Sequence, residues 1–112
     1  MIKRGEVYWV NLDPTVGAEI KKTRPGLVVS NDINNVNAQT VTVLPLTTAV
    51  EKVYPFEVFI KAGVCGNREA SKVKANQIRT VDRRRLGDLM GMAPSEIMAK
   101  VDDAVRIHLA IS

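Results

Sequence analysis

The side chains in this sequence that could act chemically on a substrate are arginines, lysines, threonines, serines and glutamates spread along the chain. Two groups of them stand close in sequence: the basic group Lys21, Lys22 and Arg24, and the hydroxyl pair Thr47 and Thr48. Cationic side chains bind phosphates and stabilise the charge that develops on a phosphorane during cleavage. An enzyme with these groups could use the 2′-hydroxyl of RNA as an internal nucleophile, because the substrate then supplies the proximity. The inventory permits RNA cleavage, but it does not select cleavage over simple binding of RNA or DNA.

The patterns that other mechanisms require are missing. The sequence has no Gly-rich phosphate loop, no Cys or His cluster and no closely spaced His–carboxylate motif. Its acidic residues form no repeated pattern suited to a two-metal site. The single cysteine, Cys65, and the single histidine, His108, are far apart in sequence, and we interpret Cys65 as buried or incidental and His108 as packed. The sequence therefore predicts neither a metal site nor a cofactor.

Size and composition are those of an ordinary globular chain. With 112 residues, 46% of them hydrophobic, we expect one domain over residues 1–112. The excess of 16 Lys and Arg over 12 Asp and Glu suits an anionic partner such as nucleic acid, and equally fits a basic surface without a specific role. A lone cysteine indicates a reducing compartment. No apolar run approaches the roughly 20 residues that span a bilayer, and the N-terminus shows no signal-peptide pattern, so we expect a cytoplasmic protein without a membrane partner.

The first two-thirds of the chain has the pattern of β-strands. Residues 7–12 are β-branched and aromatic and end at an Asp-Pro turn. Residues 26–30 are continuously apolar, which predicts a strand buried on both faces. Residues 31–37 are Asn-rich and predict a turn or short helix. Residues 40–47 predict a strand that bulges or lies at an edge near Pro45, since proline cannot donate to a ladder.

The remaining residues complete a mainly β fold with a C-terminal helix. Residues 55–60 predict a strand, residues 62–70 a loop, and residues 71–80 a second alternating strand. In that strand we expect these side chains to point outward: Lys72, Lys74 and Arg79. After Pro94, inward positions recur at helical spacing: Ile97, Val101, Ala104, His108 and Ile111. Short strands followed by one helix of about four turns predict a small barrel or bent sheet capped by that helix.

Four stretches of the sequence together resemble the MazF/PemK toxin family. The first two are RGEV at residues 4–7, continuing through LDP and GAE to residue 19, and RPGLVVSN at residues 24–31. The other two are PLTT at residues 45–48, followed by YPFEV at residues 54–58, and NQIRT at residues 76–80. Their order and spacing match across nearly the whole chain. The set is therefore far more specific than any one fragment.

The resemblance implies an SH3-like small β-barrel of the MazF/PemK/CcdB type, which agrees with the strand pattern. It also implies a sequence-selective endoribonuclease toxin that cleaves single-stranded RNA without a metal. The products would carry a 2′,3′-cyclic phosphate and a 5′-hydroxyl. Family members act as homodimers with RNA along the dimer interface, and a cognate antitoxin blocks that groove.

The family's catalytic residues map onto three positions. Its arginine falls on Arg24, its threonine on Thr47 and its loop glutamate on Glu19, which could equally be a solvated loop acid. We assign Arg24 mainly to transition-state stabilisation, because a guanidinium holds its protons tightly. Thr48 should point to the opposite face from Thr47 if the strand is regular there.

We also expect a set of RNA-binding residues: Lys21, Lys22, Thr48, Gln77 and Arg79. The lysines lie beside Arg24 in sequence and could steer RNA. The departures from the family pattern are small: Ala18 stands where serine is common, and Asn76 where an acid is frequent. The arginine run at residues 83–85 is interpreted as a solvated surface.

Two other functions stay open on the sequence alone. One is a CcdB-type toxin, which shares the barrel but poisons gyrase, and the other is a non-catalytic nucleic-acid-binding barrel. The Arg-Pro motif and the Thr pair after Pro45 and Leu46 favour the ribonuclease. RNA cleavage without added metal would separate it from both.

Overall fold

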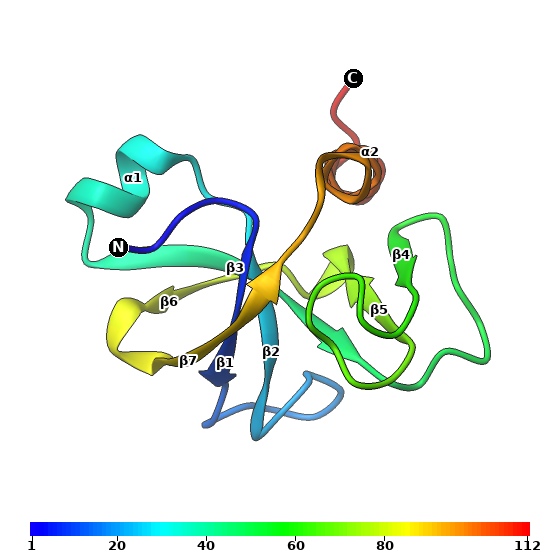
Figure 1. Cartoon of the computed structure of the whole chain (residues 1–112), viewed down its shortest axis with the longest axis horizontal. Helices are drawn as coiled ribbons and strands as arrows, with labels where there is room; N and C mark the ends of the chain where they lie inside the picture. The colour runs from blue at the N-terminus through cyan, green and yellow to red at the C-terminus, as the bar shows by residue number, and fades with distance from the viewer.

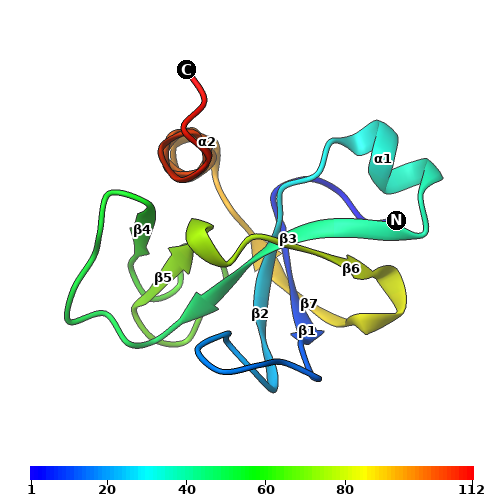
Figure 2. The same cartoon turned by 180° about the vertical axis from the view of Figure 1, so that it is seen from behind.

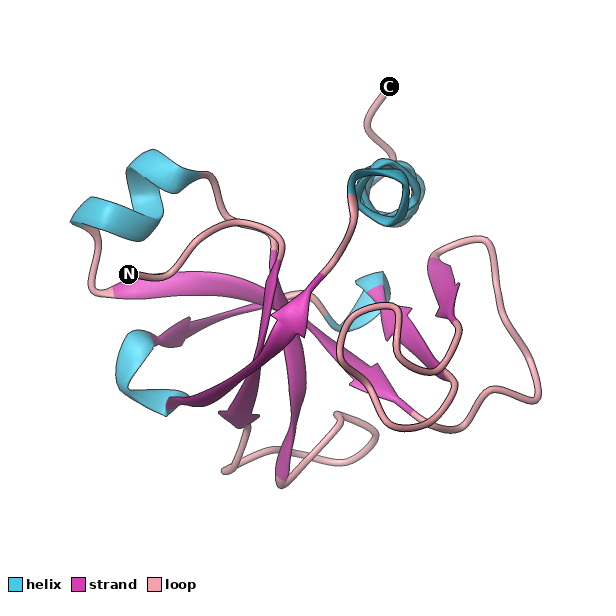
Figure 3. Ribbon diagram, viewed as in Figure 1, coloured by secondary structure: helices cyan, strands magenta, loops and turns pink.

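The computed structural model describes residues 1–112 as seven strands, two α-helices and two short 3-10 helices (Figures 1 and 3). The strands are β1 (Glu6–Asn11), β2 (Thr23–Val28), β3 (Thr40–Thr47), β4 (Glu57–Ile60), β5 (Ser71–Lys74), β6 (Arg79–Asp82) and β7 (Leu86–Met92). The helices are α1 (Asp32–Asn37), η1 (Ala75–Gln77), η2 (Arg83–Arg85) and α2 (Ser95–Leu109). Neither α-helix has the length and apolar character that a bilayer crossing requires.

All seven strands belong to one strongly bent antiparallel sheet. Its order is β4-β5-β3-β2-β1-β7, with β6 paired to β3. The terminal strands β4 and β7 do not pair with each other, so the sheet forms an open, barrel-like fold. Helix α2 crosses one end of this fold above β4 and β5 (Figure 1). This architecture confirms the expected mainly β fold with a C-terminal helix.

Strand β3 joins the two halves of the sheet (Figure 2). Its first part pairs with β2 and β6, and its last two residues, Leu46 and Thr47, pair with β5. The strand does not bulge, because its ladders run without a register shift, and it is central in the sheet order. The expected edge near Pro45 is confirmed locally, because Leu44 and Pro45 pair only with β2, and Leu46 and Thr47 pair only with β5. Pro45 sits where the pairing with β2 ends and the pairing with β5 begins, a place where a missing N–H is tolerated.

The core consists of two apolar clusters on the inner surfaces of the bent sheet. The larger one has 13 buried residues, including Leu27, Leu44 and Val73, and the smaller one has six, including Val28 and Val43. Leu27 and Val28 are adjacent and both fully buried, which confirms a strand buried on both faces. Their alternation over two clusters fixes the register of β2 against β3.

Helix α2 packs three of its five predicted inward residues into the larger cluster: Ile97, Val101 and Ala104. The prediction failed for His108 and Ile111, which are exposed. The packed stripe ends one turn earlier, and the His108 ring lies 6.5 Å from the Phe56 ring at the surface.

The segment 71–92 departs most from expectation. The single strand predicted over residues 71–80 is divided into β5, η1 and β6, and β7 was not predicted at all. Lys72, expected to face outward, is buried, because the chain between β3 and β4 covers it. Arg83 and Arg85 donate to backbone oxygens of Asn35 and of residues 11 and 13, so the arginine run fastens neighbouring segments rather than forming a solvated surface only.

Candidate functional site

A groove of about 310 Å³ lies at the sheet edge where β2 begins and β3 ends. We call it the Arg24 groove, and its lining residues are Trp9, Arg24, Pro25, Leu46, Thr47, Thr48, Glu69 and Ser71. It brings together three residues that the sequence predicted for the site, Arg24, Thr47 and Thr48.

The register of β2 against β3 explains why Arg24 and Thr47 meet. Gly26 pairs with Pro45, and continuing this antiparallel register by two residues places Arg24 level with Thr47. Ladder pairing between β2 and β3 stops at Gly26 and Pro45, so the two strands separate there and leave room for the groove. Arg24 itself pairs with Val10 of β1, which holds its backbone in place.

The guanidinium of Arg24, which lines this groove, has no partner within the protein. Its side chain is exposed and makes no hydrogen bond or ion pair with any other residue. A guanidinium carries five N–H donors in a planar fork that matches the oxygens of a phosphate. Arg24 can therefore give all of these donors to a bound anion.

The two threonines line the same groove. Thr47 is the last residue of β3, and its Oγ1 accepts a hydrogen bond from the Ala49 N–H at 3.2 Å. That contact leaves the hydroxyl proton of Thr47 available for donation. The expectation that Thr48 faces the opposite side assumed a continuing strand. Because β3 ends at Thr47, Thr48 lies beyond the alternation and also lines the groove.

Three lining residues were not expected from the sequence: Trp9, Glu69 and Ser71. The Glu69 backbone is held firmly, since its carbonyl accepts hydrogen bonds from Asn67 Nδ2 at 2.8 Å and Ser71 Oγ at 2.9 Å. Glu69 and Ser71 reach the groove through the path of the loop at residues 61–70, which leads into β5, and Trp9 reaches it from β1, where it pairs with Pro25. No sequence motif signals that path.

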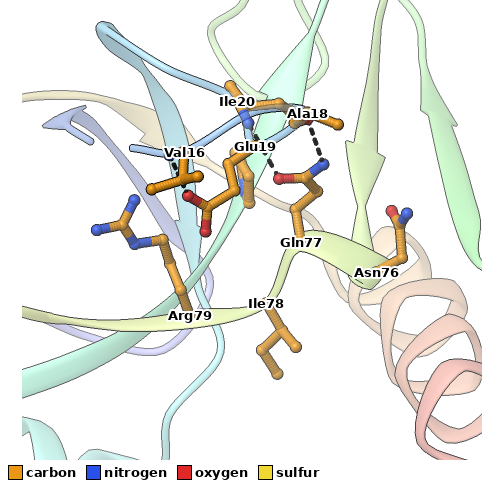
Figure 4. A pocket seen from close by; sticks show the side chains of 9 residues that line it. Val16, Ala18, Glu19, Ile20, Asn76, Gln77, Ile78 and Arg79 are labelled. Atoms are coloured by element: carbon orange, nitrogen blue, oxygen red, sulfur yellow. Dashed lines mark hydrogen bonds between the residues drawn. The ribbon is translucent and has the colours of Figure 1, made fainter. Parts of the chain in front are cut away.

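A second hollow of about 320 Å³ lies between the loop that joins β1 to β2 and residues 76–79 (Figure 4). Glu19, Gln77 and Arg79, which the sequence placed at the site, line this hollow and not the Arg24 groove. Gln77 Oε1 accepts from the Ile20 N–H at 3.1 Å, and Gln77 Nε2 donates to the Ala18 carbonyl at 3.3 Å. Figure 4 shows the Gln77 amide pointing from η1 into the loop.

Glu19 and Arg79 also have local partners in the loop. Glu19 Oε1 accepts from the Val16 N–H at 2.5 Å, and Arg79 donates to the Leu12 carbonyl at 2.9 Å. Together with Gln77, these contacts hold the loop at residues 12–20 against η1 and β6. The structure therefore gives these three side chains a role in fixing the loop that borders the basic residues.

Lys21 and Lys22 end this loop immediately before β2. Both are exposed, and neither lines the Arg24 groove. The Lys22 backbone takes a left-handed conformation (φ 69°), and its N–H donates to Asp13 Oδ1 at 3.1 Å. The lysine ammoniums make no ion pair and remain free for an anionic partner.

The cysteine and the histidine lie outside the groove. Cys65 is fully buried, as interpreted from the sequence, and burial raises the pKa of its thiol. Such a thiol is a poor nucleophile because the thiolate is the reactive form. No three His, Cys, Asp or Glu side chains converge to hold a metal ion.

Comparisons with known proteins give a consistent match. Residues 3–109 match the family model described as PemK-like, MazF-like toxin of type II toxin-antitoxin system. The chain is 40% identical to Endoribonuclease EndoA of Bacillus subtilis over 112 residues, which cover 99% of this chain and 97% of that protein. It is 39% identical to Endoribonuclease MazF9 of Mycobacterium tuberculosis over 114 residues, with 97% of each chain covered.

Solved structures agree with the sequence matches. The fold is similar to that of MazF from Deinococcus radiodurans, with a TM-score of 0.85, 28% identity, and 98% of this chain and 97% of that chain covered. It is also similar to an endoribonuclease in complex with its cognate antitoxin from mycobacterial species, with a TM-score of 0.83 and 26% identity. That match covers 100% of this chain and 98% of the other. The similarity extends over nearly the whole chain in both sequence and fold.

Proposed function

The chain belongs to the PemK-like, MazF-like toxin family of type II toxin–antitoxin systems, and from this premise we propose that it cleaves single-stranded RNA at the Arg24 groove. The membership confirms the resemblance carried by the four sequence stretches. Both relatives compared above are endoribonucleases, so the chain is an endoribonuclease toxin rather than a CcdB-type gyrase poison or a non-catalytic barrel.

The observation that supports this site is the free guanidinium of Arg24 in one groove with the Thr47 hydroxyl. In the proposed reaction the 2′-oxygen of the RNA attacks the adjacent phosphorus while the bond to the 5′-oxygen breaks. The proton lost by the 2′-hydroxyl is matched by one gained at the 5′-oxygen. The products are a 2′,3′-cyclic phosphate and a 5′-hydroxyl, and neither a metal nor a water molecule takes part.

Each residue has a distinct role in this mechanism. Arg24 stabilises the charge that grows on the phosphorane oxygens, which a preorganised cation does without reorganising. The Thr47 hydroxyl donates a hydrogen bond to a phosphate oxygen. Thr48 contacts the RNA next to that phosphate. Three residues act indirectly, by holding the loop at residues 12–20 in place: Glu19, Gln77 and Arg79. The ammoniums of Lys21 and Lys22 attract RNA toward the Arg24 groove.

The antitoxin is the second partner. The mycobacterial relative was solved with its cognate antitoxin, as was MazF of D. radiodurans with MazE. We infer that an acidic segment of a cognate antitoxin covers the Arg24 groove, because the free cations Lys21, Lys22 and Arg24 attract an acidic peptide and RNA alike. Binding of this segment should weaken as salt rises, and RNA should compete with it.

A homodimer and a cytoplasmic location complete the proposal. Exposed apolar side chains on β7, at the end of α2 and directly after it support a second copy that covers them: Leu89, Met92, Ile107, Leu109 and Ile111. The single buried, unpaired thiol of Cys65 supports a reducing compartment, which is the cytoplasm.

The test is cleavage of a defined RNA in EDTA, with mapping of the cut ends. Wild-type protein should cleave and leave cyclic phosphate ends. Arg24→Ala should lower the rate on the order of 10²–10³-fold with an unchanged melting temperature. Arg84→Ala is the matched control, because Arg84 is an exposed arginine outside the groove, and it should cleave like wild type. Near-wild-type cleavage by folded Arg24→Ala would remove Arg24 from the mechanism.

A further inference from the structure

We propose that Tyr54 is a stacking platform for a nucleobase of the RNA substrate, beside the Arg24 groove and flanked by the cation of Lys52. The inference rests on the proposed function and adds a binding subsite to it. Tyr54 lies in the chain between β3 and β4 and is 45% exposed. Its hydroxyl has no hydrogen-bond partner in the protein and is free to meet a base edge or solvent.

The Tyr54 ring is held in a defined orientation. It lies against the Phe56 ring with centroids 5.4 Å apart and planes within 1° of parallel. Phe56 is half-buried, so one face of Tyr54 is supported while the residue as a whole stays accessible. A base that stacks here loses little to the ordering of the protein, because the platform is already built.

A buried ionic network fixes the backbone under this ring. The Tyr54 N–H donates to Glu57 Oε1 at 3.0 Å, and the Glu57 carboxylate is itself bound by Lys72 Nζ at 3.0 Å and Lys74 Nζ at 2.9 Å. Lys72 Nζ also donates to the Lys52 carbonyl at 2.6 Å. The segment 52–54 is therefore fastened at both of its ends to the outer face of β4 and β5.

Lys72 also connects the platform to the Arg24 groove. It is the β5 partner of Thr47, and directly paired residues on antiparallel strands project to the same face of the sheet. The Lys72 ammonium lies 6.0 Å from the centroid of the Tyr54 ring. The chain between β3 and β4, which contains Thr48 and Tyr54, runs along the side of the fold (Figure 1). We therefore propose that an RNA strand leaving the Arg24 groove on this side passes over the ring.

The charges around the ring suit a nucleotide. The exposed ammonium of Lys52 lies over the Tyr54 ring, 5.8 Å from its centroid, and has no carboxylate partner. A base that stacks on this ring takes the place of the Lys52 ammonium, whose exposed side chain can move aside to meet a phosphate. An aromatic face and a cation together are the arrangement that binds single-stranded nucleic acids. Every base has a flat face, so this subsite adds affinity and leaves the choice of cleavage sequence to the groove.

The test is binding of an RNA made uncleavable by 2′-O-methyl groups and labelled with the fluorescent base 2-aminopurine. Tyr54→Leu should weaken binding about tenfold or more, as expected for loss of one stacked base. Tyr54→Phe should bind like wild type and keep the fluorescence quenching that stacking causes. In cleavage of the unmodified RNA, the loss in Tyr54→Leu should appear in KM. Phe59→Leu is the control, because Phe59 is a similarly exposed ring with no ring or lysine stacked on it, and it should change neither quantity.

The salt dependence of RNA affinity distinguishes the contribution of the Tyr54 ring from that of the Lys52 ammonium. Lys52→Gln should lower the slope of log affinity against log salt by about one, whereas Tyr54→Leu should leave that slope unchanged. Wild-type affinity in folded Tyr54→Leu, or absence of quenching by Tyr54→Phe at every labelled position, would overturn the proposal. Failure of the wild type to cleave RNA would refute the proposed function. The binding assay with uncleavable RNA would still test whether Tyr54 stacks a base.

Discussion

Glu57→Gln should destabilise this protein by about 3 kcal/mol, although the two side chains have nearly the same shape. The Glu57 side chain is fully buried, and three donors converge on it: the Tyr54 N–H, Lys72 Nζ and Lys74 Nζ. Glutamine keeps the size but removes the charge, so two ammoniums, of which Lys72 is only 8% exposed, lose their buried counter-ion. Breaking a buried ion pair on one side costs about 3–5 kcal/mol.

The lowered pKa of Glu57 corresponds to a loss of stability of the same size. Burial alone raises this pKa, but the hydrogen bonds from Tyr54, Lys74 and Lys72 outweigh burial and lower it from 4.5 to about 2. A difference of that size corresponds to about 3 kcal/mol of stability. Because the folded pKa lies below the unfolded one, the contribution is complete above pH 4.5 and is lost as the pH falls toward 2.

Urea unfolding at a fixed protein concentration, at pH 7 and at pH 3, measures both quantities. Between these two conditions the wild type should lose more stability than Glu57→Gln. The double variant Glu57→Gln/Lys72→Met should recover part of the loss at pH 7, because it removes the uncompensated ammonium. Asp103→Asn breaks an exposed ion pair with Arg106 and should cost less than about 1 kcal/mol. A loss below about 1 kcal/mol for Glu57→Gln, or equal pH dependence in both proteins, would refute the reasoning.

Two further predictions concern the Arg24 groove and the contact between β7 and the loop at residues 61–70. Thr47→Val should cleave RNA far more slowly in single-turnover assays at an unchanged melting temperature, whereas Thr48→Val should keep more activity, and the opposite ranking would assign the catalytic hydroxyl to Thr48. Gly91→Ala should lower the free energy of unfolding by about 1–3 kcal/mol, because a Cβ there would overlap the Cys65 carbonyl. Gly87→Ala, on the same strand with its nearest atom at 3.5 Å, should cost less in the same urea titration.

The parts of the site that could be predicted are those carried by strands. Thr47 ends the β-branched run predicted at residues 40–47, and the family motif marks it as well. Arg24 lies two residues before the apolar run predicted at residues 26–30, so only the family motif marked it, although the structure places it in β2. Glu19 and Gln77 were expected near them from the family motifs, because residue type alone would make Glu19 a solvated loop acid. A polar loop must satisfy its backbone groups, and the structure commits both side chains to that task. Residue type shows what a side chain can bind, but only the path of the loop decides what it does bind.

The outer face of β5 was mispredicted for a related reason. Alternation correctly separates Lys72 from Val73, but it cannot tell which face of a strand meets solvent once a loop crosses that face. Here the chain between β3 and β4 lies over Lys72, and Glu57 arrives from β4 to neutralise it. The YPFEV stretch contains both Tyr54 and Glu57, yet the lysine that joins them comes from another strand.

The position of the site depends on the core more than on the groove itself. Arg24 is level with Thr47 only because Leu27 pairs with Leu44 and Val28 with Val43, and these pairs direct side chains into two different apolar clusters. A slip of β2 by one residue would exchange the two clusters and expose apolar side chains, so the register is strongly specified. The same slip would carry Arg24 away from Thr47. Selection for a well-packed sheet therefore also holds Arg24 and Thr47, the proposed catalytic pair, in register, and the groove needs no dedicated contact between the two side chains.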